Sequence, residues 1–312
     1  MIKIFSMRKI LILFFLIFFS QTVFAFWIWS PKTKKWKNPK ISPKPSAQSQ
    51  FQYAKELFDK KEYLRAIKEF QKVEKYFKGS KKASLALYYI GVCYENLKED
   101  LKAFKVYKKL LESYPFFENL EEIYKRMYEI GERLEKKKSR KFLGLELEPP
   151  SLLVFRTLAE EGAHTEYAMK ALYKEGIILM RLNRFLEAQR CFKKITEEYS
   201  DSKLAKLSKF WLALCKIKSS PKIEYAQQDL ESAEKLLKEF LSECSEKELI
   251  ESAKKELKFL RGKIAEKNYK IAQFYESQKA FNSAKIYYEY IIKNFPDTEW
   301  AKKAKEKLKQ LP

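Results

Sequence analysis

Residues 85–115 read LALYYIGVCYENLKEDLKAFKVYKKLLESYP, and this stretch decides the fold. Gly91 and Ala103 stand 12 residues apart, and Pro115 follows after a further 12. Small residues at this spacing, on apolar positions of helical period, indicate two helices that approach closely, and the proline ends the second helix. The same steps return near the C-terminus, at Ala272, Ala284 and Pro296. The sequence therefore predicts a repeated helical hairpin.

The spacing resembles the tetratricopeptide repeat, a unit of about 34 residues in two antiparallel helices. The 12-residue step also occurs between Ala54 and Ala66 and between Gly176 and Ala188, and looser hairpins surround Gly131 and Ala213. Large apolar residues at matching offsets are expected to form the core: Leu57, Phe70, Val73, Tyr94, Tyr107, Leu110, Leu179, Phe192, Ile195, Tyr275, Tyr288 and Ile291. We predict an all-α tetratricopeptide-repeat superhelix over 51–312, with about six helix hairpins, a cap helix at 299–310 and a hinge near 142–150.

The composition favours long charged helices, because 7 Gly and 10 Pro accompany 64 Lys+Arg and 41 Asp+Glu. The net charge of +23 is spread among alternating acids and bases, which is typical of solvated helix faces, so no nucleic acid partner is expected. Four cysteines without metal-ligand spacing and a single histidine, His164, give no metal site. We likewise expect no catalytic residues and no cofactor.

The N-terminus has the pattern of an export signal. Basic residues precede the apolar run 10–19, and small residues at Val23 and Ala25 predict cleavage after Ala25, whether translation starts at Met1 or Met7. Residues 26–50 are then expected to form an extended tail rich in Trp, Lys and Pro. Its tryptophans, Trp27, Trp29 and Trp36, either pack against the first repeat or form a reversible membrane-interface anchor beside the lysines.

Residues 265–308, AEKNYKIAQFYESQKAFNSAKIYYEYIIKNFPDTEWAKKAKEKL, resemble the last repeat of BamD-type outer-membrane assembly factors. The resemblance extends over about residues 50–310. It implies a periplasmic, non-catalytic protein at the outer membrane, whose N-terminal repeats take unfolded outer-membrane proteins and whose C-terminal repeats dock on the β-barrel insertase. Members usually carry a lipid-acceptor cysteine directly after the signal. Phe26 stands there in this chain, so the sequence does not support a lipid anchor.

A row of aromatic residues is the candidate peptide groove. The residue three positions before each small Gly or Ala is aromatic in all six hairpins: Phe51, Tyr88, Tyr128, Tyr173, Phe210 and Tyr269. With Lys55 and Asn96 nearby, this ladder would suit an extended client segment rich in aromatic residues. The alternative is that the ladder only packs against neighbouring helices and stabilises the array.

Two other functions share this kind of sequence. Tetratricopeptide adaptors also serve cell division and pilus assembly, although no heptad run precedes Phe51 as is common in division coordinators. Some lytic enzymes of the cell wall carry a long helical superhelix ahead of a catalytic domain. The hairpins and cap account for nearly all residues after 50, so we expect a protein that binds other proteins and is not an enzyme.

Overall fold

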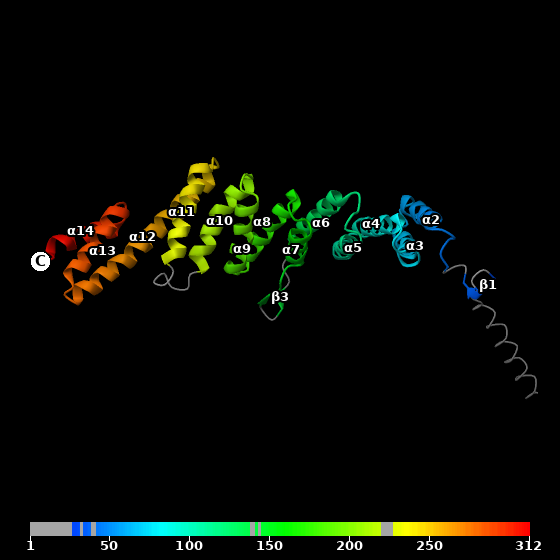
Figure 1. Cartoon of the computed structure of the whole chain (residues 1–312), viewed down its shortest axis with the longest axis horizontal. Helices are drawn as coiled ribbons and strands as arrows, with labels where there is room; N and C mark the ends of the chain where they lie inside the picture. Colours follow the sequence, from blue (N-terminus) through cyan, green and yellow to red (C-terminus); the bar gives the residue numbers. More distant parts are fainter. Residues whose placement is uncertain (1–26, 32–33, 39–41, 138–140, 143–144, 220–226) are drawn as a thin grey trace, which may run out of the picture. The chain divides into compact units, whose positions relative to one another are not determined.

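The computed structural model describes residues 27–31, 34–38, 42–137, 141–142, 145–219 and 227–312. The predicted signal peptide, 1–25, lies outside the described residues. The chain forms two compact units, Met1–Phe117 and Glu118–Pro312, which are described separately (Figure 1).

The first unit contains two helical hairpins and a short β-ribbon. Strands β1 (Ile28–Ser30) and β2 (Lys35–Lys37) are antiparallel and precede the helices. The helices are α2 (Ala47–Asp59), α3 (Tyr63–Tyr76), α4 (Lys81–Asn96) and α5 (Asp100–Ser113). Helix α2 packs on α3, α3 on α4 and α4 on α5, so the second hairpin follows directly on the first (Figure 1).

The second unit continues with four hairpins and a terminal helix. Its elements are α6 (Leu120–Glu135), β3 (Lys141–Phe142), β4 (Leu145–Glu146), α7 (Pro150–Glu161), α8 (Glu166–Arg181), α9 (Phe185–Glu198), α10 (Lys203–Ser219), α11 (Gln227–Glu243), α12 (Lys247–Ser277), α13 (Phe281–Asn294) and α14 (Glu299–Gln310). Each helix packs against the next one along the chain, and α14 also lies on α12. The terminal helix has the predicted bounds of the cap, 299–310.

Small residues on the first helix of a hairpin accommodate a large ring from the second. A β-carbon built on Gly91 would stand 2.2 Å from the Tyr107 ring, and one on Gly176 would stand 2.7 Å from the Phe192 ring. In α6, a β-carbon on Gly131 would stand 2.5 Å from Phe155 of α7. These rings are fully buried, as are Phe70 and Tyr288 in the hairpins of Ala54 and Ala272. The all-α tetratricopeptide fold predicted from the spacing is confirmed.

The helix boundaries follow from local hydrogen bonds. Ser80, Thr165 and Thr298 cap α4, α8 and α14 by accepting a backbone N–H at the third helical position. Four hairpin turns place a residue in the left-handed backbone conformation, with φ near 60°, at the same position after the first helix. These residues are Lys61, Lys98, Asn183 and Lys279. The backbone N–H of the residue that follows returns to a carbonyl five positions back, as from Glu99 to Tyr94 at 2.9 Å. This closes the turn without glycine.

The structure adds detail to two expectations for the N-terminal part of the chain. Helix α2 begins at Ala47 rather than after residue 50, because the Ser46 and Ser49 side chains form a capping box there. The tail ahead of it is not only extended, since β1 and β2 pair in an antiparallel ribbon. The two units divide after Phe117. The segment in which a hinge is expected, 142–150, connects α6 to α7, and these two helices pack on each other. The hinge stays a prediction.

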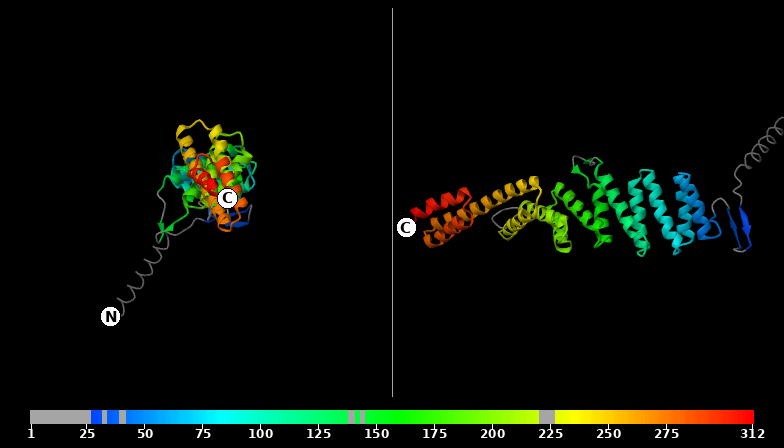
Figure 2. Two further views of the ribbon diagram at one scale, coloured as in Figure 1. Left: turned by 90° about the vertical axis from the view of Figure 1, so that its left-hand side faces the viewer. Right: turned by 90° about the horizontal axis from the view of Figure 1, so that it is seen from above.

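Helix α12 was not anticipated as one element. It runs unbroken for 31 residues, Gly262 included, and it is the long gold-to-orange helix in Figure 2. It packs against both α11 and α13. No helix among the described residues is both long and apolar enough to span a bilayer.

Candidate functional site

The aromatic ladder is mostly a packing device. Five of its six members contact the large ring of the returning helix in their own hairpin, at centroid separations of 5.3–6.0 Å: Phe51 with Phe70, Tyr128 with Phe155, Tyr173 with Phe192, Phe210 with Phe240 and Tyr269 with Tyr288. Phe51, Phe210 and Tyr269 are buried. These three cannot face a client, so the predicted groove is corrected at those positions. Burial of two rings against each other stabilises the hairpin whatever it binds.

The other three ladder residues are half-buried and keep an accessible edge. Tyr88 lies 6.1 Å from Phe117, and Tyr128 lies 6.1 Å from Tyr167. Tyr173 accepts a hydrogen bond of 2.8 Å from Trp211 Nε1. Burial raises the pKa of Tyr128 to about 12, with nearby Glu132 and Glu135 adding to the effect. The Tyr128 phenol therefore stays neutral at physiological pH.

An aromatic patch remains accessible on the first helices of unit one. We define it by Lys55, Phe58, Tyr63, Tyr88 and Tyr89, all half-buried. Phe58 contacts Tyr89 at 5.1 Å and Tyr63 at 5.8 Å between ring centroids, with the rings edge to face. The Lys55 ammonium lies 5.1 Å from the Phe58 ring and 5.3 Å from the Tyr89 ring. The patch combines partly exposed ring edges with one cation, which suits an extended chain.

The sequence analysis included Lys55 and Tyr88 but missed Phe58, Tyr63 and Tyr89. Tyr89 comes directly after the ladder position, and it reaches Phe51 at 5.7 Å and stacks on Phe70 at 5.4 Å in the preceding hairpin. The doubled tyrosine in YYIG was the available signal. Asn96, in contrast, is exposed and donates to Val92 O of its own helix at 2.9 Å, so nothing joins it to the patch.

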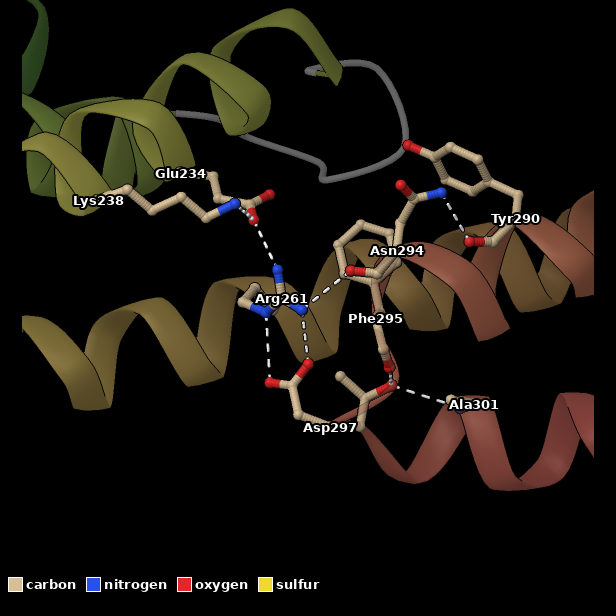
Figure 3. A network of polar contacts seen from close by, with 9 residues as sticks. Glu234, Lys238, Arg261, Tyr290, Asn294, Phe295, Asp297 and Ala301 are labelled. Atoms are coloured by element: carbon tan, nitrogen blue, oxygen red, sulfur yellow. Dashed lines mark hydrogen bonds and ion pairs between the residues drawn. The ribbon is translucent and has the colours of Figure 1, made fainter.

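The second unit contains a polar network at the junction of three helices (Figure 3). Arg261 of α12 donates to Glu234 of α11 at 2.8 Å, and to the Asn294 carbonyl at the end of α13 at 2.9 Å. Its guanidinium also donates a hydrogen bond to each carboxylate oxygen of Asp297, at 2.5 and 3.3 Å, and lies 5.2 Å from the Phe295 ring. The hydrogen bond from Arg261 holds the pKa of Asp297 below its usual range. This one side chain fixes where α13 turns into α14.

Exposed apolar side chains lie on the same helices. Phe259 and Phe274 of α12 and Ile286 of α13 are each more than half exposed. Phe259 and Phe274 are 15 residues apart, which places them about 60° from each other around a helix of 3.6 residues per turn. They form a candidate docking strip along α12.

The buried cysteines are poor nucleophiles. Burial raises the pKa of Cys93 and of Cys215 to about 12, and it raises the pKa of Cys191 as well. Their thiols stay protonated near neutral pH. No group of three or more His, Cys, Asp or Glu side chains in the described ranges is placed to hold a metal ion. His164, predicted to be a solvated loop residue, is exposed with φ 65°.

The tail tryptophans are all largely exposed, with Trp27 at 56%, Trp29 at 46% and Trp36 at 61%. Trp29 and Trp36 lie opposite each other in the β1–β2 ribbon, with ring centroids 5.6 Å apart.

Comparison with known proteins bears on the second unit most directly. The family YfiO, described as outer membrane lipoprotein, matches residues 210–310, which run from α10 to α14. The tetratricopeptide-repeat family matches residues 85–116 and 170–202. The chain is thus a tetratricopeptide-repeat protein whose C-terminal third is similar to an outer-membrane lipoprotein family. No curated protein matches the chain.

Several solved structures are similar to the chain at low identity. A tetratricopeptide repeat protein from Parabacteroides merdae is 18% identical, over 84% of this chain and 97% of that one, with a TM-score of 0.32. PilF of Pseudomonas aeruginosa is 12% identical over 84% and 97%, with a TM-score of 0.29. YrrB, a tetratricopeptide protein with an unusual peptide-binding site, is 19% identical over 64% and 88%, with a TM-score of 0.30.

Proposed function

We propose that the protein is a non-catalytic periplasmic scaffold of the outer-membrane β-barrel assembly machinery, binding the insertase and unfolded barrel clients. The similarity of residues 210–310 to an outer-membrane lipoprotein family carries this proposal. The tetratricopeptide repeats elsewhere support a protein-binding role, because such arrays expose long faces of helices and few loops. The buried, protonated thiols favour a scaffold over an enzyme with a cysteine nucleophile.

The second unit is the proposed docking surface for the insertase. Its exposed strip of Phe259, Phe274 and Ile286 lies on α12 and α13, inside the matched region. The Arg261 network holds the adjoining turn in one geometry, so the strip is presented on a rigid support. A preorganised apolar surface binds with a smaller ordering cost than a mobile one.

The first unit is the proposed client site. Its aromatic patch offers the edges of Phe58, Tyr88 and Tyr89, with Lys55 above two of these rings. Strands of β-barrels alternate apolar and polar residues and carry aromatic girdles, so an unfolded barrel segment can stack on such a patch. A client carboxylate would pair with Lys55, which already contacts Asp59.

Site-resolved crosslinking in the cell envelope tests both halves of this proposal. A photoreactive phenylalanine is placed singly at Phe274, at Tyr88, and at Lys235 as a control, since Lys235 of α11 is 81% exposed and lies outside both surfaces. We expect Phe274 to capture the β-barrel insertase, Tyr88 to capture nascent barrel proteins, and Lys235 to capture neither. Capture of cell-division or pilus-assembly proteins at Phe274 would instead make this an adaptor of another envelope system.

A further inference from the structure

The β1–β2 ribbon presents its tryptophans together. Trp29 pairs directly across the ribbon with Trp36, so both side chains leave on the same face. Trp27 stands directly before β1 and is 56% exposed. The chain turns at Lys34, which is exposed and has φ 47°. Two indoles thus share one face of the ribbon, and a third stands beside its first strand.

The segment that carries these indoles is strongly cationic. Between Phe26 and Lys55 the sequence holds no Asp or Glu, and Glu56 is the first acid after the predicted cleavage point. Lysines occur throughout this stretch: Lys32, Lys34, Lys35, Lys37, Lys40, Lys44 and Lys55. Elsewhere in the chain acids and bases alternate, so this segment differs in kind from the helices. A basic segment without acids is attracted to an anionic surface.

The exit from the ribbon is fastened to the first hairpin. Buried Gln50 of α2 accepts a hydrogen bond of 2.8 Å from the Lys44 backbone N–H. It also donates to the Glu69 carbonyl at 3.1 Å and to the Glu69 carboxylate at 2.8 Å. A pocket of about 760 Å³ lies where β1 faces α2 and α3, lined by Trp29, Tyr53, Arg65 and Glu69 among others. The chain that enters α2 is therefore held on the first hairpin at Lys44, and Trp29 lines the adjoining pocket while 46% of its surface stays exposed.

We propose that the β1–β2 ribbon seats reversibly on a bilayer containing anionic lipid, with its three indoles in the headgroup layer and its lysines near the phosphates. Tryptophan favours this layer, because its ring is apolar and its N–H finds polar partners there. Each lysine near an anionic leaflet adds roughly 1 kcal/mol, and no single one of these elements gives permanent attachment. This surface is distinct from the aromatic patch and from the docking strip on α12, and it does not depend on the insertase.

Vesicle binding tests the proposal. The protein is purified from cell envelopes, so that its N-terminus has been processed as it is in the cell. Sedimentation is measured with vesicles of phosphatidylcholine alone and of phosphatidylcholine mixed with phosphatidylglycerol. The first variant replaces Trp27, Trp29 and Trp36 by Ser. The second replaces Lys34, Lys35 and Lys37 by Gln. The control is Phe116→Ser, which removes the most exposed large apolar side chain of the same unit, 96% exposed.

We expect the unaltered protein and the Phe116 control to bind the anionic vesicles equally, and to bind phosphatidylcholine alone far more weakly. Losing three lysines should weaken binding about a hundredfold, at roughly fivefold each, and added salt should weaken it further. The tryptophan variant should lose binding while its thermal unfolding is unchanged, because the replaced rings are exposed. Unchanged binding of either variant would overturn the proposal. Equal binding to both kinds of vesicle would also overturn it.

Discussion

The ring of Tyr107 lies so close to Gly91 that a β-carbon on the glycine would stand 2.2 Å from Tyr107 Cε1. Gly91→Ala is therefore expected to lower the free energy of unfolding by about 1–3 kcal/mol, since the buried ring has nowhere to move. Gly262→Ala in α12 is the matched control, because nothing lies within 4 Å of the added carbon there. It should raise stability by about 0.5–1 kcal/mol through helix propensity. Urea unfolding of both variants checks the pair, and equal effects would contradict the close packing.

The left-handed hairpin turns give a second prediction. Lys98 has φ 60° at the end of α4, where a β-carbon is unfavourable and glycine is not. Lys98→Gly should stabilise the protein by about 0.5–1 kcal/mol. The control is Lys105→Gly, at an exposed position inside α5, which should destabilise it by about 1 kcal/mol. Thermal unfolding would show melting temperatures that move in opposite directions, and a loss at Lys98 would contradict the turn geometry.

Buried Glu175 and half-buried Glu135 should give opposite dependences of stability on pH. Burial raises the pKa of Glu135, but hydrogen bonds from Lys174 at 3.0 Å and Arg181 at 2.5 Å bring it below the ordinary value. Its contribution to stability is present above the unfolded pKa of about 4.3 and is lost as pH falls through the folded pKa. For Glu175, burial outweighs the 2.9 Å bond from Arg156 and raises the pKa. Its contribution is present below the unfolded pKa and is lost as pH rises through the folded one.

Unfolding free energies measured across the acidic range compare Glu135→Gln and Glu175→Gln. The first should reduce the fall in stability toward low pH, and the second should reduce the fall as pH rises toward neutrality. If both substitutions changed the slope of unfolding free energy against pH in the same direction, the assignment would be contradicted.

The Arg261 network predicts local sensitivity at the C-terminus. Arg261→Lys keeps the charge but loses the planar fork that holds Asp297, Glu234 and the Asn294 carbonyl together. We expect the free energy of unfolding to fall by about 1–3 kcal/mol and amide exchange in α13 and α14 to become faster. Lys254→Ala serves as control, because the Lys254–Glu251 pair on the same helix is exposed and should contribute less than about 1 kcal/mol. An Arg261→Lys variant as stable as the unaltered protein would show that a positive charge alone holds this turn.

Tyrosines of the aromatic ladder should separate into packing and binding positions. Tyr269 is buried against Tyr288 and Trp300, so Tyr269→Ala should lower stability by about 3–5 kcal/mol. Tyr88 is half-buried, and Tyr88→Ala should cost less than this and weaken binding of an unfolded barrel segment. Calorimetry with a purified barrel-derived peptide, run beside chemical unfolding, measures both effects. A Tyr88 variant that binds normally would remove this residue from the client site.

The sequence predicted most of the core, because close packing restricts which residues fit there, although Tyr94 and Tyr275 are only half-buried. Only a small residue fits beneath the rings of Tyr107 and Phe192, so Gly91 and Gly176 mark their hairpins in the sequence. The same pattern predicted the cap helix at residues 299–310. Turn residues such as Lys98 carry no such signal, since lysine rarely adopts φ near 60° and the turn depends on backbone hydrogen bonds.

The interaction surfaces were predicted only in part. Phe51, Phe210 and Tyr269 occupy the same repeat position as Tyr88, and their burial depends on the size and direction of rings on other helices. Phe58 and Tyr89 join the patch because consecutive hairpins stack, a relation that spacing within one repeat does not contain. Likewise, Gly262 interrupts the pattern of α12 in sequence but not in structure, because the helix has open space beside it.

The proposed scaffold role is tested most directly by identifying the proteins bound to the chain in its own envelope. Cells are crosslinked, the protein is affinity-purified, and its partners are identified by mass spectrometry, with the Phe259→Ser, Phe274→Ser double variant processed in parallel. We predict recovery of the β-barrel insertase and nascent barrel proteins, with the insertase lost from the variant. Recovery of division or pilus components, without the insertase, would contradict the assignment to barrel assembly.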